Sequence, residues 1–342
     1  MKLLETFQVK NLTLKNRIVM PPMCTYAADS KGLANDRHLI HYASRAAGGT
    51  ALIIVEATGV RPDGRITDRC LGIWDDSQVE GLRRIVNACH AEGAMAAIQL
   101  NHAGRKCTAC PDQGDYTLAP SAIAFDSTYR LPREMNQEDM DQVKEAFCDG
   151  ARRAHAAGFD AIEIHAAHGF LLSSFFSPVT NRRKDHYGGS LENRARYLLE
   201  VLEAVRVSWP GEKAILFRLS ATDYLPGGTS VDDTIWLVNQ ASSLIDIAHI
   251  SSGGIASLPI DVFPGYQLPL AEAVKKNCGL PVIAVGGIRQ ADMAEEILGN
   301  GRADLVALGK ELLRNPFWVA QTAWERGHDI CWPELSRTAF EE

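Results

Sequence analysis

Eight short runs of aliphatic and β-branched residues recur along the chain, and stretches with apolar residues at helical spacing separate them. Gly, Pro or polar residues bound each run, as they bound strands. We predict strands at residues 17–20, 51–57, 95–100, 161–165, 214–220, 246–251, 281–287 and 304–309. Strict alternation of strand and helix requires parallel strands and right-handed crossovers, and eight units can close the sheet. The sequence therefore predicts an α/β fold of the (β/α)8 (TIM) barrel type.

A length of 342 residues suits one such barrel with insertions, and 46% hydrophobic residues supply a large core. No linker rich in Pro, Gly or Ser divides the chain, so we expect one domain over residues 1–342. The two longest connections, residues 101–137 and 166–190, would lie at the C-terminal ends of strands. Barrel insertions at that face usually build the substrate pocket.

The chain is mildly negative, with 35 basic and 42 acidic residues and no run of Lys or Arg. This composition argues against a nucleic-acid or membrane-surface binder and favours a small-molecule partner. The N-terminus has no apolar segment followed by a cleavage site, and no stretch reaches the roughly 20 apolar residues of a membrane span. We therefore expect a cytoplasmic protein.

Eight cysteines are scattered without a repeated spacing, which suits reduced thiols better than a disulfide framework. Cys107 and Cys110 form a Cys-x-x-Cys pair. A structural zinc would need two further ligands, and no second pair or His-x-x-x-His follows. The sequence favours two loop cysteines, with zinc as the alternative.

Two of the predicted strands end in glycine. Gly286 and Gly287 end the seventh strand, and Gly309 stands before Lys310 at the end of the eighth. Loops at these positions often bind phosphate through backbone N–H groups and the following helix. Tight turns explain the same glycines, but Lys310 favours an anion.

Arg218 and Gln99 lie in otherwise apolar strands. An unpaired buried charge is costly, so Arg218 either pairs with a carboxylate such as Glu163 or faces a bound anion. The Gln99 amide can both donate and accept, which suits the edge of a heterocycle such as a flavin ring. A core amide satisfied by its neighbours is the alternative.

His165 and His168 follow the fourth predicted strand, in "IHAAHGFL". A catalytic metal would need a third ligand, and Glu163 shares a strand face with His165. Two imidazole donors could instead hold a carbonyl oxygen or phenolate and stabilise the negative charge that develops when hydride adds to a conjugated alkene. Polar residues that merely end a strand are the third interpretation.

The ordered motifs of the chain resemble those of the old yellow enzyme family of FMN-dependent ene reductases. The motifs are "LKNRIVMPPMCTY", "ALIIVEATGV", "IQLNHAGRK", "GFDAIEIHAAHGFLLSSFFSP", "NRRKDHYGGSLENR", "AVGGI" and "NGRADLVALGK". Cys24 together with Tyr26 resembles the bacterial, thermophilic-like class of that family. The resemblance implies a (β/α)8 barrel that holds FMN at its C-terminal mouth.

The resemblance also assigns roles to residues. It implies flavin contacts by Pro21, Pro22, Met23, Cys24, Ala57, Gln99, Arg218, Gly286, Gly287, Gly309 and Lys310. It implies that His165 and His168 hold the substrate oxygen, that Tyr26 closes the pocket and that Cys24 tunes the flavin. Phe170 and Arg337 would also contact the substrate, Arg337 from a neighbouring subunit of a homo-oligomer, a dimer or tetramer.

The implied reaction has two hydride transfers. NADPH, or NADH, reduces FMN, and flavin N5 then delivers hydride to the β-carbon of an α,β-unsaturated carbonyl or nitro compound. A proton added to the α-carbon completes the reduction.

Two residues depart from the family pattern. Lys310 stands where the family usually has arginine, so the planar fork for phosphate is lost. Phe170 stands where the family has the tyrosine regarded as the proton donor, and a phenyl ring cannot donate. Water, Tyr26 or Tyr187 would then protonate the α-carbon, or the acceptor is a quinone or oxygen, or the enzyme runs a redox-neutral C=C isomerisation or a desaturation.

Two alternatives come from other classes. One is a metal-dependent hydrolase or lyase on the same barrel that uses His165, His168 and Glu163, because a fold alone does not fix function. The other is a protein that binds or stores flavin without catalysis.

Overall fold

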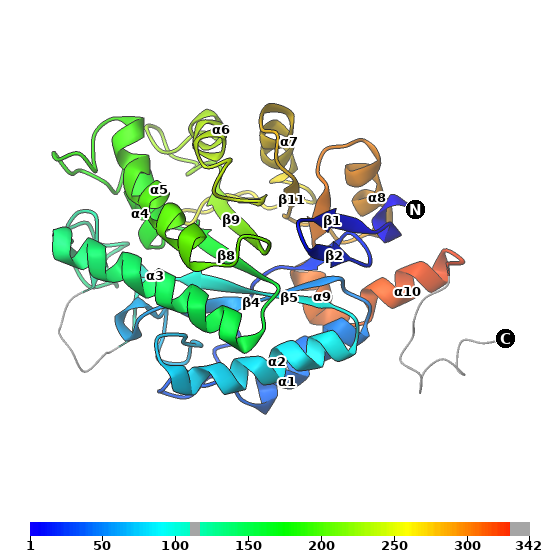
Figure 1. Cartoon of the computed structure of the whole chain (residues 1–342). Helices are drawn as coiled ribbons and strands as arrows, with labels where there is room; N and C mark the ends of the chain where they lie inside the picture. Colours follow the sequence, from blue (N-terminus) through cyan, green and yellow to red (C-terminus); the bar gives the residue numbers. More distant parts are fainter. Residues whose placement is uncertain (110–116, 329–342) are drawn as a thin grey trace.

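The computed structural model describes residues 1–109 and 117–328, and eight parallel strands in it close into a barrel. All eight predicted strands and the predicted (β/α)8 fold are confirmed (Figure 1). The barrel strands are β3 (Ile18–Met20), β4 (Leu52–Gly59), β5 (Met95–Asn101), β8 (Ala161–Ala166), β9 (Ala214–Ser220), β10 (Ile247–Ser251), β11 (Val282–Ala284) and β12 (Leu305–Ala307). Each strand pairs with the next one along the chain, and β12 pairs with β3 to close the barrel.

Helices follow the strands and cover the outside of the barrel (Figure 1). They are α1 (Asp36–Ala47), α2 (Val79–Ala91), α3 (Gln137–Ala157), α4 (Leu171–Phe176), α5 (Leu191–Ser208), α6 (Val231–Gln240), α7 (Leu268–Asn277), α8 (Ala291–Gly299), α9 (Lys310–Arg314) and α10 (Trp318–Glu325). Local sequence fixes their ends, as α3 shows. The Asn136 side chain accepts from the Asp139 backbone N–H at 2.9 Å, and Gly158 ends the helix at φ +95°.

A hairpin of β1 (Phe7–Val9) and β2 (Leu12–Leu14) precedes the barrel. Leu12 and Leu14 are buried against residues that point into the barrel, including Val19 and Leu52. The hairpin therefore closes the N-terminal end of the barrel and leaves the C-terminal end for function.

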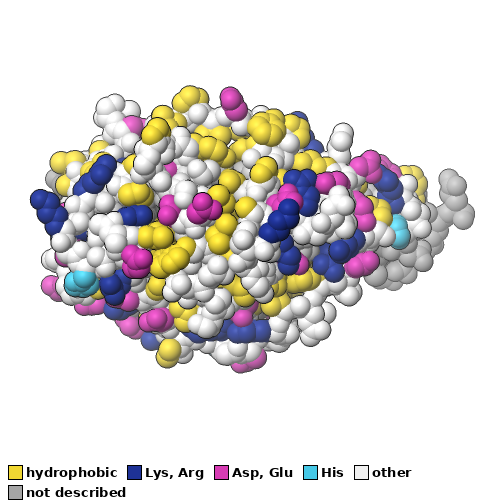
Figure 2. All heavy atoms as spheres, turned by 90° about the horizontal axis from the view of Figure 1, so that it is seen from above, with side chains coloured by type: hydrophobic (Ala, Val, Ile, Leu, Met, Phe, Trp, Pro, Cys, Tyr) yellow, Lys and Arg dark blue, Asp and Glu magenta, His cyan; other side chains and the backbone are white. Residues whose placement is uncertain are grey.

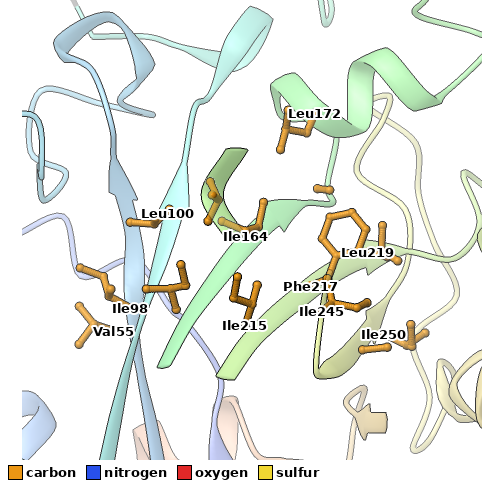
Figure 3. Packing of buried hydrophobic residues seen from close by; sticks show 14 of the residues in the cluster. Val55, Ile98, Leu100, Ile164, Leu172, Ile215, Phe217, Leu219, Ile245 and Ile250 are labelled. Atoms are coloured by element: carbon orange, nitrogen blue, oxygen red, sulfur yellow. The ribbon is translucent and has the colours of Figure 1, made fainter. Parts of the chain in front are cut away.

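Alternate strand residues face opposite sides of the barrel wall. Ile162 and Ile164 belong to the apolar cluster between the barrel and the helices. Figure 3 shows Ile164 in this cluster with Ile98, Ile215 and Leu172. Glu163 and His165 therefore point into the barrel, as does Arg218, the register partner of His165 on β9. This alternation gathers polar side chains at the upper end of an apolar barrel.

Residues 101–109 and 117–137 contact residues 166–190 beside the barrel mouth. The former contain the 3-10 helix η4 (Gly104–Lys106) and a two-stranded sheet of β6 (Leu118–Ala119) and β7 (Arg133–Glu134), and the latter contain α4. The Leu171 N–H donates to the His102 carbonyl at 3.0 Å, and the Arg182 N–H donates to Ser121 Oγ at 2.9 Å. The two segments are thus held as one wall.

The surface carries charges of both signs. Basic and acidic side chains are interspersed over the face that Figure 2 presents, with hydrophobic side chains between them. Within residues 1–109 and 117–328, no helix is both long enough and apolar enough to span a membrane.

Candidate active site

A cavity of about 330 Å3 opens at the C-terminal ends of the strands. Its lining includes six residues that the sequence singled out, namely His168, Arg218, Gly286, Gly287, Gly309 and Lys310. Residues far apart in the sequence thus meet at the predicted place.

Two glycines shape the wall of this cavity. Gly286 has φ +115° and Gly287 has φ +67°, so both adopt backbone conformations that other residues rarely take. A Cβ on Gly286 would lie 2.7 Å from Gln267 Oε1, and one on Gly287 would lie 2.8 Å from the Phe263 carbonyl oxygen. The loop after β11 therefore requires glycine and exposes backbone to the cavity.

The charged side chains of the lining are predominantly basic. Arg218, Arg289 and Lys310 line the cavity with one carboxylate, that of Glu311. Arg218 is only 7% exposed, and its Nε has no hydrogen-bond partner within the described part of the chain. A buried donor without an acceptor suits an anionic or strongly accepting ligand in the cavity.

Of the two partners considered for Arg218, the carboxylate of Glu163 makes its hydrogen bonds elsewhere. Glu163 accepts from Gln99 Nε2 at 2.8 Å and lies 2.6 Å from His249 Nδ1. All three side chains are buried in the barrel interior. Gln99 therefore donates one of its two amide N–H groups to Glu163, and its amide oxygen can accept from a ligand.

The two histidines form a chain with a serine. His165 Nε2 lies 3.0 Å from His168 Nδ1, and His168 Nε2 lies 2.8 Å from Ser251 Oγ. His168 has φ +61°, and its N–H donates to Ser220 Oγ at 2.9 Å, which holds this unusual conformation. Burial lowers the pKa of both imidazoles well below its ordinary value, and nearby positive charges including Arg218 add to the effect. Both rings are therefore neutral at pH 7.

The hydrogen-bond network is consistent with one donor order along this chain. Gln267 Nε2 donates to Ser251 Oγ at 3.2 Å, and the serine hydroxyl can donate to His168 Nε2. In that order His168 Nδ1–H donates to His165 Nε2, and His165 carries its proton on Nδ1. His165 Nδ1 is buried and has no partner among the described residues. This order leaves His165 Nδ1–H as a donor for a ligand.

The loop from Pro21 to Tyr26 is tied to the end of β4. The Thr25 N–H and hydroxyl donate to the Glu56 carboxylate at 2.8 and 2.7 Å, and burial raises the pKa of Glu56 to about 7. On the other side, a Cβ on Gly309 would lie 3.5 Å from Met23 Sδ and 3.7 Å from Pro21 Cγ. Pro21 and Met23 therefore adjoin the cavity wall, and Pro22 lies between them.

Cys24, in the same loop, has a thiol partner that the sequence analysis missed. Its side chain hydrogen-bonds Cys70, which raises the pKa of Cys24 well above the ordinary value and lowers that of Cys70 to about 6. Tyr26 also contacts Cys24, and burial raises the pKa of the Tyr26 phenol to about 12. Cys70 lies in a different loop, and no spacing in the sequence links it to Cys24.

Phe170 lies in a small apolar cluster beside His165. It packs with Ala103, Cys107 and Ala109, and its ring centroid is 4.9 Å from that of His165. Buried apolar side chains therefore lie where the family tyrosine was expected.

Lys106, which the sequence analysis did not single out, lies beside the same cluster. Its Nζ is 5.0 Å from the centroid of the Phe170 ring and donates to the carbonyls of His168 at 2.9 Å and Gly254 at 3.2 Å. Burial, with help from Arg105, lowers the pKa of Lys106 to about 8.

The other predicted residues fall in different places. Ala57 is buried at an irregularity in the pairing of β4, near its C-terminal end. The prediction of Tyr187 as a proton donor was wrong. Its hydroxyl donates to Glu200 at 3.2 Å, and its ring packs against Tyr197 on α5. Arg337 and Cys110 lie outside the described residues.

The geometry of residues 1–109 and 117–328 does not support the metal site considered for His165, His168 and Glu163. No group of three or more His, Cys, Asp or Glu side chains in these ranges is arranged to hold a metal ion. Glu163, the third ligand considered for the histidines, hydrogen-bonds Gln99 and His249 instead.

The fold and the cavity define a (β/α)8 barrel with a basic, glycine-lined cavity at its mouth, where such barrels place their active sites. The model of the NADH:flavin oxidoreductase / NADH oxidase family matches residues 2–328. An NADPH dehydrogenase of Clostridium acetobutylicum is 50% identical over 99% of this chain and 100% of its own length, and one of Geobacillus thermodenitrificans is 50% identical over 96% and 95%. The chain therefore belongs to this family, which is the old yellow enzyme family that the motifs resemble.

Solved structures of two reductases resemble this fold over nearly its whole length. Morphinone reductase in complex with tetrahydroNAD superimposes with a TM-score of 0.80 at 29% identity, over 98% of this chain and 93% of its own. A 2-naphthoyl-CoA reductase gives 0.89 at 26% identity, over 96% of this chain and 52% of its own. The protein is an NAD(P)H-dependent flavin oxidoreductase with FMN as its cofactor.

Proposed function

We propose that the enzyme is an ene reductase that reduces the C=C bond of an α,β-unsaturated carbonyl or nitro compound. The observation that carries this proposal is the hydrogen-bonded chain of Ser251, His168 and His165, which ends at a buried His165 Nδ1 without a partner among the described residues. A preorganised donor in a site that excludes water stabilises negative charge that develops on a substrate oxygen. Such charge develops when hydride adds to a conjugated alkene.

The residues present fit FMN. The basic lining and the glycine loops suit the phosphate, with Lys310 and the backbone after Gly286 and Gly309 as its binding groups. Arg218 would place positive charge beside the flavin ring, and the Gln99 oxygen would accept from the ring edge. Bound FMN supplies the hydride, and NADPH or NADH restores it.

The chain's own residues then orient and polarise the substrate. His165 would donate to the substrate oxygen, and His168 would fix the His165 tautomer. We place Tyr26, with 43% of its surface exposed, at the outer side of the pocket. The segments 101–137 and 166–190 would form the substrate wall, and Arg337 of a neighbouring subunit would complete it in a homodimer or homotetramer.

The proposal is tested by half-reactions. Purified protein should show the flavin absorption band near about 450 nm, and anaerobic NADPH should bleach it. Cyclohexenone, maleimide, a nitroalkene and a quinone are then offered separately as acceptors. Reoxidation by the alkenes, with the saturated product formed, is the expected result.

A second candidate is quinone reduction, which Phe170 favours because a quinone needs no proton on carbon. Reoxidation by the quinone but by none of the alkenes would establish it in place of alkene reduction. Reoxidation by none of the acceptors would instead favour a flavin-storage role.

A further inference from the structure

An alkene reduction needs a proton as well as a hydride, and the wall beside His165 lacks the expected phenol. Phe170 cannot donate, and Tyr187 packs against α5 with its hydroxyl on Glu200. Tyr26 is a weak acid, since its pKa is raised to about 12. The inference that follows rests on the proposed function and concerns the source of this proton.

Lys106 is a charged residue whose ammonium group contacts the Phe170 ring. Its Nζ lies against the face of the Phe170 ring, 5.0 Å from the centroid, and that ring packs on His165. Two of its three N–H donors hold the His168 and Gly254 carbonyls, at 2.9 and 3.2 Å. An ammonium group has three donors, so the two carbonyls leave one N–H of Lys106 for proton transfer.

The surroundings of Lys106 favour release of a proton. Arg105 on the same 3-10 helix repels the ammonium charge, and Asp126, from the loop between β6 and β7, is the carboxylate that opposes it. His165 and His168 face it as neutral rings. The Phe125 and Phe170 rings, whose centroids lie 4.3 and 5.0 Å from Nζ, stabilise the ammonium form, but burial outweighs them. The resulting pKa of about 8 is close to working pH, as general acid catalysis prefers.

We propose that Lys106 is the catalytic acid that protonates the α-carbon, in place of the tyrosine that Phe170 replaces. Reduced FMN, when bound, would supply the hydride, which brings two electrons to the β-carbon and forms the new C–H bond there. The π pair moves to the α-carbon and the oxygen that His165 holds. An Nζ–H bond then breaks, the proton bonds to the α-carbon, and the pair stays on nitrogen as a neutral amine. Solvent reprotonates this amine before the next turnover.

The main test compares Lys106→Met with Lys213→Met in the FMN-loaded enzyme. Lys213 is a matched control, because its Nζ also donates to a backbone carbonyl, that of Phe159, and also lies over an aromatic ring, that of Trp209, 5.3 Å away. It precedes β9 and so lies at the opposite end of the barrel. We expect Lys106→Met to slow flavin reoxidation by cyclohexenone about 100-fold relative to reoxidation by a quinone. Lys213→Met should keep the wild-type ratio.

A second variant separates acid catalysis from loop support. Lys106→Gln keeps an N–H for the His168 carbonyl but has no proton to lose, so it should be as slow with cyclohexenone as Lys106→Met. In wild type the cyclohexenone rate should fall as pH rises through about 8, and both variants should lack this step. Adding Phe170→Tyr to Lys106→Met should restore at least about tenfold of the rate. A Lys106→Gln variant with the wild-type rate would overturn the proposal.

A readout that does not depend on activity is the titration of the amine itself. Trace acetylation of the holoenzyme at a series of pH values, measured by mass spectrometry, should give Lys106 a midpoint near about 8 and surface lysines one near about 10.4. A midpoint of Lys106 equal to that of the surface lysines would overturn the proposal, as would an unchanged ratio of cyclohexenone to quinone rates in Lys106→Met. If the wild type reduces no alkene at all, the proposed function falls and this inference falls with it.

Discussion

His249 Nδ1 lies 2.6 Å from Glu163 Oε2 in the barrel interior, and neither side chain reaches solvent. The other carboxylate oxygen of Glu163 accepts from Gln99 Nε2. One carboxylate thereby fixes the orientation of the amide that we assign to the flavin edge. Gln99, Glu163 and His249 thus form one connected hydrogen-bonded unit in the barrel interior rather than a set of independent contacts.

Breaking this unit should be costly. Glu163→Leu leaves His249 and Gln99 with unsatisfied buried donors, and His249→Leu leaves the carboxylate with one partner fewer. Each change should lower the free energy of unfolding by about 2–4 kcal/mol in urea titrations. The double variant should lose clearly less than the sum, because the pair is removed together. Strictly additive losses would contradict the coupling.

The glycine loop after β11 should tolerate no side chain. Gly286→Ala forces φ +115° on alanine and places Cβ 2.7 Å from Gln267 Oε1. The strain costs about 1–3 kcal/mol and should weaken FMN binding by about tenfold, measured by quenching of flavin fluorescence. Gly279→Ala is the control, since a Cβ added at Gly279 would meet no atom within 4 Å. Equal FMN affinities of the two variants would count against the loop as a cofactor contact.

Lys310 should act on the phosphate alone. Lys310→Met removes one of the cavity's positive charges, so FMN should bind about 10- to 100-fold more weakly. Riboflavin, which has no phosphate, should bind equally to wild type and variant. Lys310→Arg should bind FMN at least as tightly, because its planar fork makes two contacts. A parallel loss of riboflavin affinity would show that Lys310 does not serve the phosphate.

Histidines that are neutral in the fold make it sensitive to acid. Burial lowers the pKa of His102 to about 4, and its Nδ1 accepts the Gly104 N–H at 3.1 Å. Above the unfolded value of about 6.5 both states are neutral, whereas below it the unfolded chain binds the proton first. Protonation of His102 in the unfolded chain therefore lowers the free energy of unfolding by up to about 3 kcal/mol as pH falls from about 6.5 to about 4.

His102→Asn keeps an acceptor for Gly104 and should flatten that slope, measured by urea unfolding at several pH values with excess FMN. Glu56 has the opposite pH dependence. Its pKa is raised to about 7 in the fold, so its contribution to the free energy of unfolding is lost as pH rises through that value. An unchanged slope in His102→Asn would show that this histidine is already charged in the fold.

The fold was predictable because the spacing of apolar residues along the sequence differs between strands and helices. Each barrel strand is apolar on both faces and each helix on one, so the eight units could be counted in the sequence. The cavity was predictable because strand ends of a parallel barrel must converge, which brought Arg218 and Lys310 together. Glu163 could not be assigned, since the choice between Arg218 and His249 depends on angles around the barrel that no spacing encodes.

The contacts between loops were also beyond the sequence. Cys70 meets Cys24 and Lys106 meets Phe170 only because loops after different strands fold over the same rim. Side-chain direction in such loops depends on packing rather than on local propensity. Tyr187 shows the opposite case. Its hydroxyl had the chemistry of a proton donor, but in the fold it donates to Glu200 on α5.

The apolar cluster of Ala103, Cys107, Ala109 and Phe170 has a consequence for the handedness of the product. Its side chains are buried, and Lys106 lies over the Phe170 ring. In the proposed mechanism the hydride comes from the cofactor and the proton from this one lysine, so a prochiral α-carbon would be approached from a single face. An alkene that bears a substituent there should therefore yield one enantiomer, and widening the cluster would be the direct route to altering that selectivity.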